Sequence, residues 1–97
     1  MEIQQIRQEL AEKIKGIAPI GKKLKFDLDG HYMLIDGTGT ENVMTDQNDA
    51  ADCTVTMSVD TYLKLQRNEL KPLKATLTRK LKVKGDLSVA RQLRQLM

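Results

Sequence analysis

The 97-residue sequence contains few of the side chains on which catalysis and large aromatic cores depend. It has no Trp, and Phe26, Tyr32 and Tyr62 are its only aromatic residues. Cys53 is the only cysteine, so an internal disulfide is excluded and a reducing compartment is favoured. No apolar run approaches the roughly 18 residues of a membrane-spanning helix, and no signal-peptide pattern is visible. We therefore expect a cytoplasmic protein.

Groups that could perform catalysis are equally scarce. A nucleophile needs a neighbouring base, but the only histidine, His31, falls at the start of a predicted strand, where exposure is common. Cys53 alternates with Val55 in an apolar phase, which is typical of a buried thiol. The acids between positions 46 and 52 lack the spacing of a calcium loop. We expect no enzymatic activity, no metal site and no cofactor.

Charged residues are unevenly distributed along the chain. Residues 26–63 contain eight acidic and no basic side chains, whereas residues 64–97 contain ten basic side chains against Glu69 and Asp86. Because Leu and Val alternate with these bases, we favour mutual neutralisation of acidic strands and basic helices within one fold. A transient contact of the basic third with a membrane or an acceptor enzyme stays open. Nucleic-acid binding is disfavoured, since interleaved aromatic residues are absent.

Apolar spacing predicts an N-terminal helix followed by four strands. The helical stripe advances by three or four residues at a time through Ile3, Ile6, Leu10, Ile14 and Ile17. Alternation predicts strands over residues 24–28, 31–36, 42–45 and 53–57. Ser58 is then placed to cap a second helix.

The last third of the chain, residues 71–97, changes from helix to strand and back to helix. Pro72 suits a first helical turn, and leucines then recur every four residues. Period-two alternation over residues 81–84 predicts a fifth strand that ends at Gly85. Asp86 is placed to cap a final helix with the apolar stripe Leu87, Ala90, Leu93, Leu96 and Met97. We expect this helix to close over the rest of the fold, for instance as a lid over a cavity.

This order predicts an α+β fold with a mostly antiparallel five-stranded sheet and helices packed on one face. No repeat, linker or low-complexity segment divides the chain, so we expect one domain. The sheet face toward the helices is expected to carry Phe26, Leu34, Cys53, Val55, Met57 and Val83, although alternation leaves the phase of the edge strands open.

The same C-terminal residues resemble a known family. Pro72 and Ala75, followed by Lys-Leu-Lys-Val-Lys-Gly-Asp over residues 80–86 and Leu-Ser-Val-Ala over 87–90, are similar to the signature of the sterol carrier protein type 2 family. The alternating segment and helix start over 51–63 resemble that family too. The resemblance implies that residues 1–97 are a small stand-alone sterol carrier protein-like, lipid-binding domain.

Members of this family carry a hydrophobic tunnel between sheet and helices that takes fatty acids, fatty acyl-CoA, sterols and other lipids. By resemblance, the tunnel here would be lined by Leu34, Met57, Tyr62, Leu73, Leu77, Val83, Ala90, Leu93 and Leu96. A carboxylate or phosphate at the tunnel mouth could be held by bases such as Lys82, Lys84, Arg91 or Arg94. Composition alone favours plain core filling, so the tunnel depends on the resemblance.

The implied function is a non-catalytic intracellular carrier whose partner is a lipid or another elongated apolar ligand. The assembly would be a monomer or a homodimer. The alternative is a protein–protein interaction or dimerisation module that uses the apolar terminal helix without lipid cargo.

Overall fold

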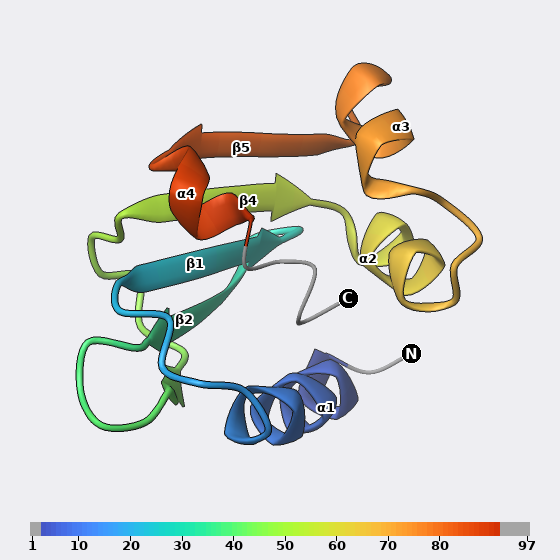
Figure 1. Ribbon diagram of the computed structural model, residues 1–97. Coiled ribbons are helices and arrows are strands. Elements are labelled where there is room, and N and C mark those ends of the chain that lie inside the picture. The colour runs from blue at the N-terminus through green and yellow to red at the C-terminus, as the bar shows by residue number, and fades with distance from the viewer. Residues whose placement is uncertain (1–2, 92–97) are drawn as a thin grey trace.

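The computed structural model describes residues 3–91 of the chain (Figure 1). Within that range the elements follow the predicted order: α1 (Ile3–Lys15), β1 (Lys23–Leu28), β2 (His31–Asp36), β3 (Val43–Thr45), β4 (Cys53–Met57), α2 (Val59–Gln66), α3 (Pro72–Leu77), β5 (Leu81–Gly85) and α4 (Leu87–Ala90). No helix in this range is long and apolar enough to cross a bilayer. The predicted continuation of the last helix to Leu93, Leu96 and Met97 lies outside the described residues.

The five strands form one sheet in the order β3-β2-β1-β4-β5, which confirms an α+β fold with a five-stranded sheet. The prediction of a mostly antiparallel sheet is wrong, because the central strands β1 and β4 are parallel and the sheet is mixed. The cause is the connection after β3. From that edge the chain returns to add β4 to the free side of β1, and β5 then pairs antiparallel with β4.

The strand register divides the side chains between two faces of the sheet, since directly paired residues point the same way. One face, here called the inner face, carries Leu24, Phe26, Leu28, Met33, Ile35, Met44, Cys53, Val55, Met57, Leu81 and Val83. The opposite, outer face carries Lys23, Lys25, Asp27, Tyr32, Leu34, Asp36, Val43, Thr45, Thr54, Thr56, Lys82 and Lys84. The inner face is therefore apolar and the outer face is largely polar.

Leu34 was predicted on the inner face, and this placement is wrong. Leu34 pairs with Lys25, so its side chain lies on the outer face, where it is nevertheless buried. The buried residues Met33, Leu34 and Ile35 are consecutive, which hides the phase of this strand in the sequence. Its register places Met33 beside Phe26 instead.

All four helices contribute side chains to one core with the inner face. Their buried members are Ile6, Leu10, Ile14, Tyr62, Leu65, Ala75 and Val89. Figure 1 shows α3 and α4 at opposite ends of β5. The helices therefore cover the inner face, as the amphipathic stripes predicted.

Short polar contacts fix the ends of several elements. The N–H of Thr61 donates to Ser58 Oγ at 3.0 Å, and the N–H of Ser88 donates to Asp86 Oδ1 at 2.8 Å, so both predicted N-caps are confirmed. Gly85 has a φ of +108°, and a side chain there would collide with the backbone carbonyl of Asp52. This glycine lets the end of β5 lie directly against the start of β4.

The buried side chain of Asn42 joins the loop before β3 to the segment that follows α1. Asn42 Nδ2 donates to the carbonyl oxygens of Ile14 at 3.2 Å and Ala18 at 3.1 Å, and Asn42 Oδ1 accepts from the N–H of Ile20. A Cβ atom added to Gly37 would lie 2.6 Å from Asn42 Oδ1. Asn42 therefore positions α1 against the sheet with hydrogen bonds that the sequence did not predict.

Candidate functional site

The candidate ligand-binding surface lies on the inner face, where β4 leads into α2 and β5 pairs with β4. Met57 ends β4 and Tyr62 lies in the following helix, and both belong to the buried core. Val83 of β5 pairs with Val55 and packs against this core from a half-buried position. The Ser58 cap starts α2 directly after β4, so strand and helix carry their apolar side chains to one surface.

Tyr62 places a hydroxyl group in this apolar environment. The side chain is fully buried, and its hydroxyl has no hydrogen-bond partner of ordinary geometry within the described part of the chain. Burial raises the pKa of Tyr62 to about 12, the Glu9 carboxylate adds to that rise, and the Gln66 side chain opposes it. The phenol is thus neutral at physiological pH. It can donate to an oxygen of a bound molecule, because a buried hydroxyl gains from a partner.

The structure brings together only some of the predicted tunnel residues. Met57 and Tyr62 share the buried core, with Val83 at its margin. Ala90 ends α4, which packs on the same core through Val89. The two remaining C-terminal positions, Leu93 and Leu96, lie outside the described residues. Within residues 3–91 the structure shows no tunnel.

Leu34, Leu73 and Leu77 do not face this surface. Leu34 lies on the outer face of the sheet. Leu73 and Leu77 belong to α3, and they are 72% and 75% exposed. The buried residue of α3 is Ala75, so the helix packs through its small side chain and turns both leucines outward. The family resemblance, in contrast, implied that both leucines line a tunnel.

Two of the four bases predicted near a tunnel mouth lie away from the inner face. Lys82 and Lys84 alternate with Val83 along β5, and their side chains are therefore on the outer face. Arg91 follows α4 and is exposed, while Arg94 lies outside the described residues. Recognition of an anionic group by Lys82 or Lys84 would thus occur on the far side of the sheet.

Groups with catalytic potential are isolated from one another. Cys53 is fully buried, and burial, with a contribution from the Asp86 carboxylate, raises the pKa of its thiol. A raised pKa keeps the thiol protonated and poorly nucleophilic. His31 is exposed at the start of β2. Among residues 3–91 no cluster of His, Cys, Asp and Glu is arranged to hold a metal ion.

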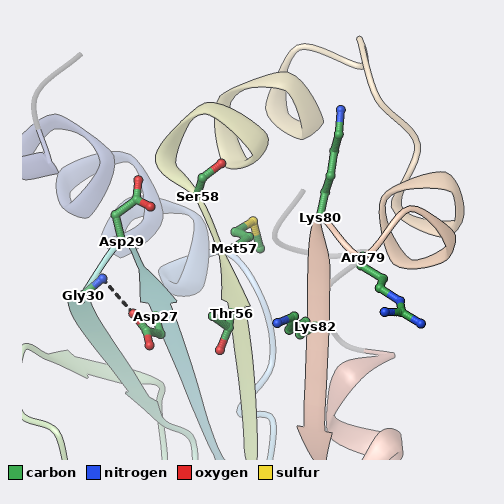
Figure 2. A pocket seen from close by; sticks show the side chains of 9 residues that line it. All are labelled: Asp27, Asp29, Gly30, Thr56, Met57, Ser58, Arg79, Lys80 and Lys82. Carbon is green, nitrogen blue, oxygen red and sulfur yellow. Dashed lines mark hydrogen bonds between the residues drawn. The ribbon is translucent and has the colours of Figure 1, made fainter.

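An open groove of about 310 Å³ lies where β1 and β4 end and β5 begins (Figure 2). It is lined by Asp27, Asp29, Gly30, Thr56, Met57, Ser58, Arg79, Lys80 and Lys82. Asp27 accepts from the N–H of Gly30, and Asp29 accepts from the N–H of Val59, both at 2.9 Å. The two carboxylates are therefore already occupied by the local backbone.

The bases of this groove do not converge on one point. Figure 2 shows Lys82 pointing toward Thr56, whereas Arg79 and Lys80 point away from it. The groove is thus a polar surface feature rather than a cradle for one anion. Sequence analysis did not predict it, because its residues come from separate segments that only the sheet pairing brings together.

Comparisons with known proteins agree on one family. The model of the SCP-2 sterol transfer family matches residues 2–97. No curated protein sequence matches the chain. The crystal structure of sterol carrier protein 2 like 2 from Aedes aegypti superposes with a TM-score of 0.75 at 15% identity, covering 98% of this chain and 95% of that chain.

Two further solved structures are similar. Apo sterol carrier protein 2 from Yarrowia lipolytica has a TM-score of 0.68 at 23% identity, covering 95% of this chain and 76% of that chain. The solution structure of palmitated SCP2L2 from Aedes aegypti has a TM-score of 0.68 at 18% identity, covering 96% of this chain and 91% of that one. These structures establish the fold, and the family model covers nearly the entire sequence. The chain belongs to the SCP-2 sterol transfer family.

Proposed function

We propose that the protein is a non-catalytic intracellular lipid carrier, formed by residues 1–97 as one domain, that acts in the cytoplasm without a cofactor. The observation that carries this proposal is the match to a sterol transfer family over residues 2–97. The similar Aedes aegypti protein is palmitated in one structure, which favours acyl chains among the cargoes. Fatty acids, fatty acyl-CoA and sterol-like molecules are the proposed cargo classes.

The proposed binding surface is the apolar inner face beside α2. Met57, Tyr62 and Val83 would contact the cargo there, together with Ala90, Leu93 and Leu96 near the end of the chain. Each CH₂ group transferred from water to such a surface contributes about 0.8 kcal/mol, so a long chain binds with little polar recognition. The buried Tyr62 hydroxyl would donate to a carboxyl or hydroxyl oxygen of the cargo.

Native mass spectrometry of the purified protein tests the proposal directly. We expect the folded protein to carry co-purified lipid, and the delipidated protein to take up palmitate at one equivalent per chain. A lipid-free protein that takes up neither palmitate nor a sterol would contradict the carrier function. A lipid-free dimer would support the protein-interaction module instead.

Two adjacent positions on β5 offer a matched pair of variants. Val83 faces the inner side and Lys82 the outer side, so Val83→Trp should obstruct the binding surface while Lys82→Trp should not. The natural sequence has no Trp, so each variant carries a single fluorescent reporter. We expect palmitate to change the emission of Val83→Trp only and to bind it at least about tenfold more weakly, as loss of one or two CH₂ contacts would produce. Thermal melts establish that both variants are folded, and equal affinities would exclude the inner face as the site.

A further inference from the structure

Helix α3 presents an apolar ridge to solvent. Ala75 is its buried residue, and at about 100° per residue Leu73 and Leu77 lie on the opposite side of the helix. Residues four apart are neighbours on a helix surface, so the two leucines form one continuous ridge. Such a pair normally marks the buried side of a helix. Here it points directly away from the core.

The segment that contains this ridge is rich in bases. Residues 71–85 contain no Asp or Glu, and their bases are Lys71, Lys74, Arg79, Lys80, Lys82 and Lys84. All six side chains are exposed. Within residues 3–91 none of them takes part in an ion pair, since the ion pairs there involve other bases. The leucine ridge and the bases next to it in sequence, Lys71, Lys74, Arg79 and Lys80, are here called the α3 edge.

Size and charge indicate which partner the α3 edge fits. A standard protein interface buries roughly 800 Å² on each partner, which a six-residue helix with two leucines cannot supply. A bilayer requires no complementary shape, because short apolar side chains insert among the headgroups while bases attract anionic lipid. Residues 71–85 contain no acidic side chain, so an anionic bilayer would not repel this part of the chain.

We propose that the α3 edge docks the protein reversibly on membranes that contain anionic lipid. Leu73 and Leu77 insert at the level of the headgroups, and the bases of the α3 edge contact lipid phosphates. The inference deepens the proposed function, because a lipid carrier must meet the membrane that supplies or receives its cargo. Docking is measured without cargo, so failure of one proposal leaves the other testable.

The test is co-flotation of the full chain with vesicles of phosphatidylcholine alone and of phosphatidylcholine mixed with phosphatidylglycerol. We expect binding to the anionic vesicles, loss of that binding at high salt, and little binding to the neutral vesicles. The double variant Leu73→Ser with Leu77→Ser should bind about tenfold more weakly. Lys74→Glu with Lys80→Glu should lose binding to a similar extent.

Matched controls come from exposed residues elsewhere. Leu87 is 66% exposed on α4, at the other end of β5, and Lys15 is exposed at the end of α1. Leu87→Ser and Lys15→Glu should bind anionic vesicles as the unmodified chain does. All substituted side chains are exposed, so the variants should remain folded by circular dichroism. Equal binding by all variants would overturn the proposal. A dimer in sedimentation analysis that Leu73→Ser with Leu77→Ser dissociates would overturn it as well.

Discussion

The side-chain oxygen of Asn42 accepts a hydrogen bond from the backbone N–H of Ile20 at 3.0 Å. Its amide nitrogen donates at the same time to carbonyl groups at the end of α1 and beyond it. One buried side chain thus satisfies backbone groups that no helix or strand pairs. The position of α1 on the core depends on this contact as well as on the apolar stripe.

Replacement of Asn42 by Ala should destabilise the fold markedly. It leaves the Ile20 N–H and the carbonyl of Ile14 without their partner in a region where Asn42 is 8% exposed. We expect the free energy of unfolding in urea to fall by about 2–3 kcal/mol. The control is Asn48→Ala, which removes an exposed contact to Lys25 and should change it by less than about 0.5 kcal/mol. Similar losses in both variants would contradict this role for Asn42.

Gly85→Ala should also lower the free energy of unfolding, by about 2–4 kcal/mol. Its φ of +108° disfavours any side chain, and a Cβ atom would strike the backbone of Asp52 in the adjacent strand. Gly39→Ala is the matched control, because a Cβ atom there meets nothing within 4 Å. Equilibrium unfolding of the two variants checks the difference, and a stable Gly85→Ala protein would show that β5 can pair differently.

Asp86 should make stability depend on pH in the acid range. Hydrogen bonds from the Lys22 ammonium and then from Ser88 hold the pKa of the Asp86 carboxyl far below its ordinary value. Because the folded pKa lies below the unfolded value of about 3.9, the stabilisation is fully present above that pH and is lost as the pH falls from there through the lower folded pKa. Asp86→Asn should therefore melt at a lower temperature at neutral pH and lose less stability below about pH 4.

Thermal melts of the unmodified chain and of Asp86→Asn across the acid range measure this difference. Asp49→Asn serves as the control, since the Asp49 side chain is exposed in the loop before β4. The control should follow the unmodified protein. Parallel pH profiles for Asp86→Asn and the unmodified chain would refute the assigned role of the Lys22–Asp86 pair.

Cys53 should react with thiol reagents only when the core opens. The side chain is fully buried and its pKa is raised by burial. We expect labelling by a disulfide reagent to be at least about 100-fold slower in buffer than in urea. The folded pKa of the thiol exceeds the unfolded value of about 8.5. The free energy of unfolding should therefore be highest below that pH, and it should fall as the pH rises from there toward the folded pKa. Thr56→Cys in a Cys53→Ala background places the thiol on the exposed outer face, and it should label rapidly in buffer.

Local signals in the sequence were sufficient to predict most of the helices and strands. Ser58 and Asp86 predicted where α2 and α4 begin, because a capping side chain bonds to a backbone N–H within three residues of itself. Alternation identified β1 and β4 because one side of each strand is apolar over its full length. The parallel pairing of β1 with β4 could not be read in this way, since strand direction depends on a connection across the sheet.

The candidate site was harder to predict for the same reason. Met57 and Tyr62 are close in sequence, and the structure places both in the core. Leu73 and Leu77 repeat like core leucines, yet α3 packs through Ala75, and no one-dimensional pattern distinguishes these two arrangements. Which side of a short helix is buried depends on how closely its backbone approaches β5.

The place of β1 in the sheet has a consequence for how the chain is made. β1 is synthesised before the other four strands of the sheet, yet it becomes the central strand, and its Leu24 pairs with Cys53 of β4, which is made later. The nascent hairpin of β1 and β2 therefore exposes an unpaired strand edge until residues 53–57 have been synthesised. Such an edge recruits strands from other chains. The rate of translation through the β3–β4 connection thus sets how long each newly made molecule is exposed to misassembly.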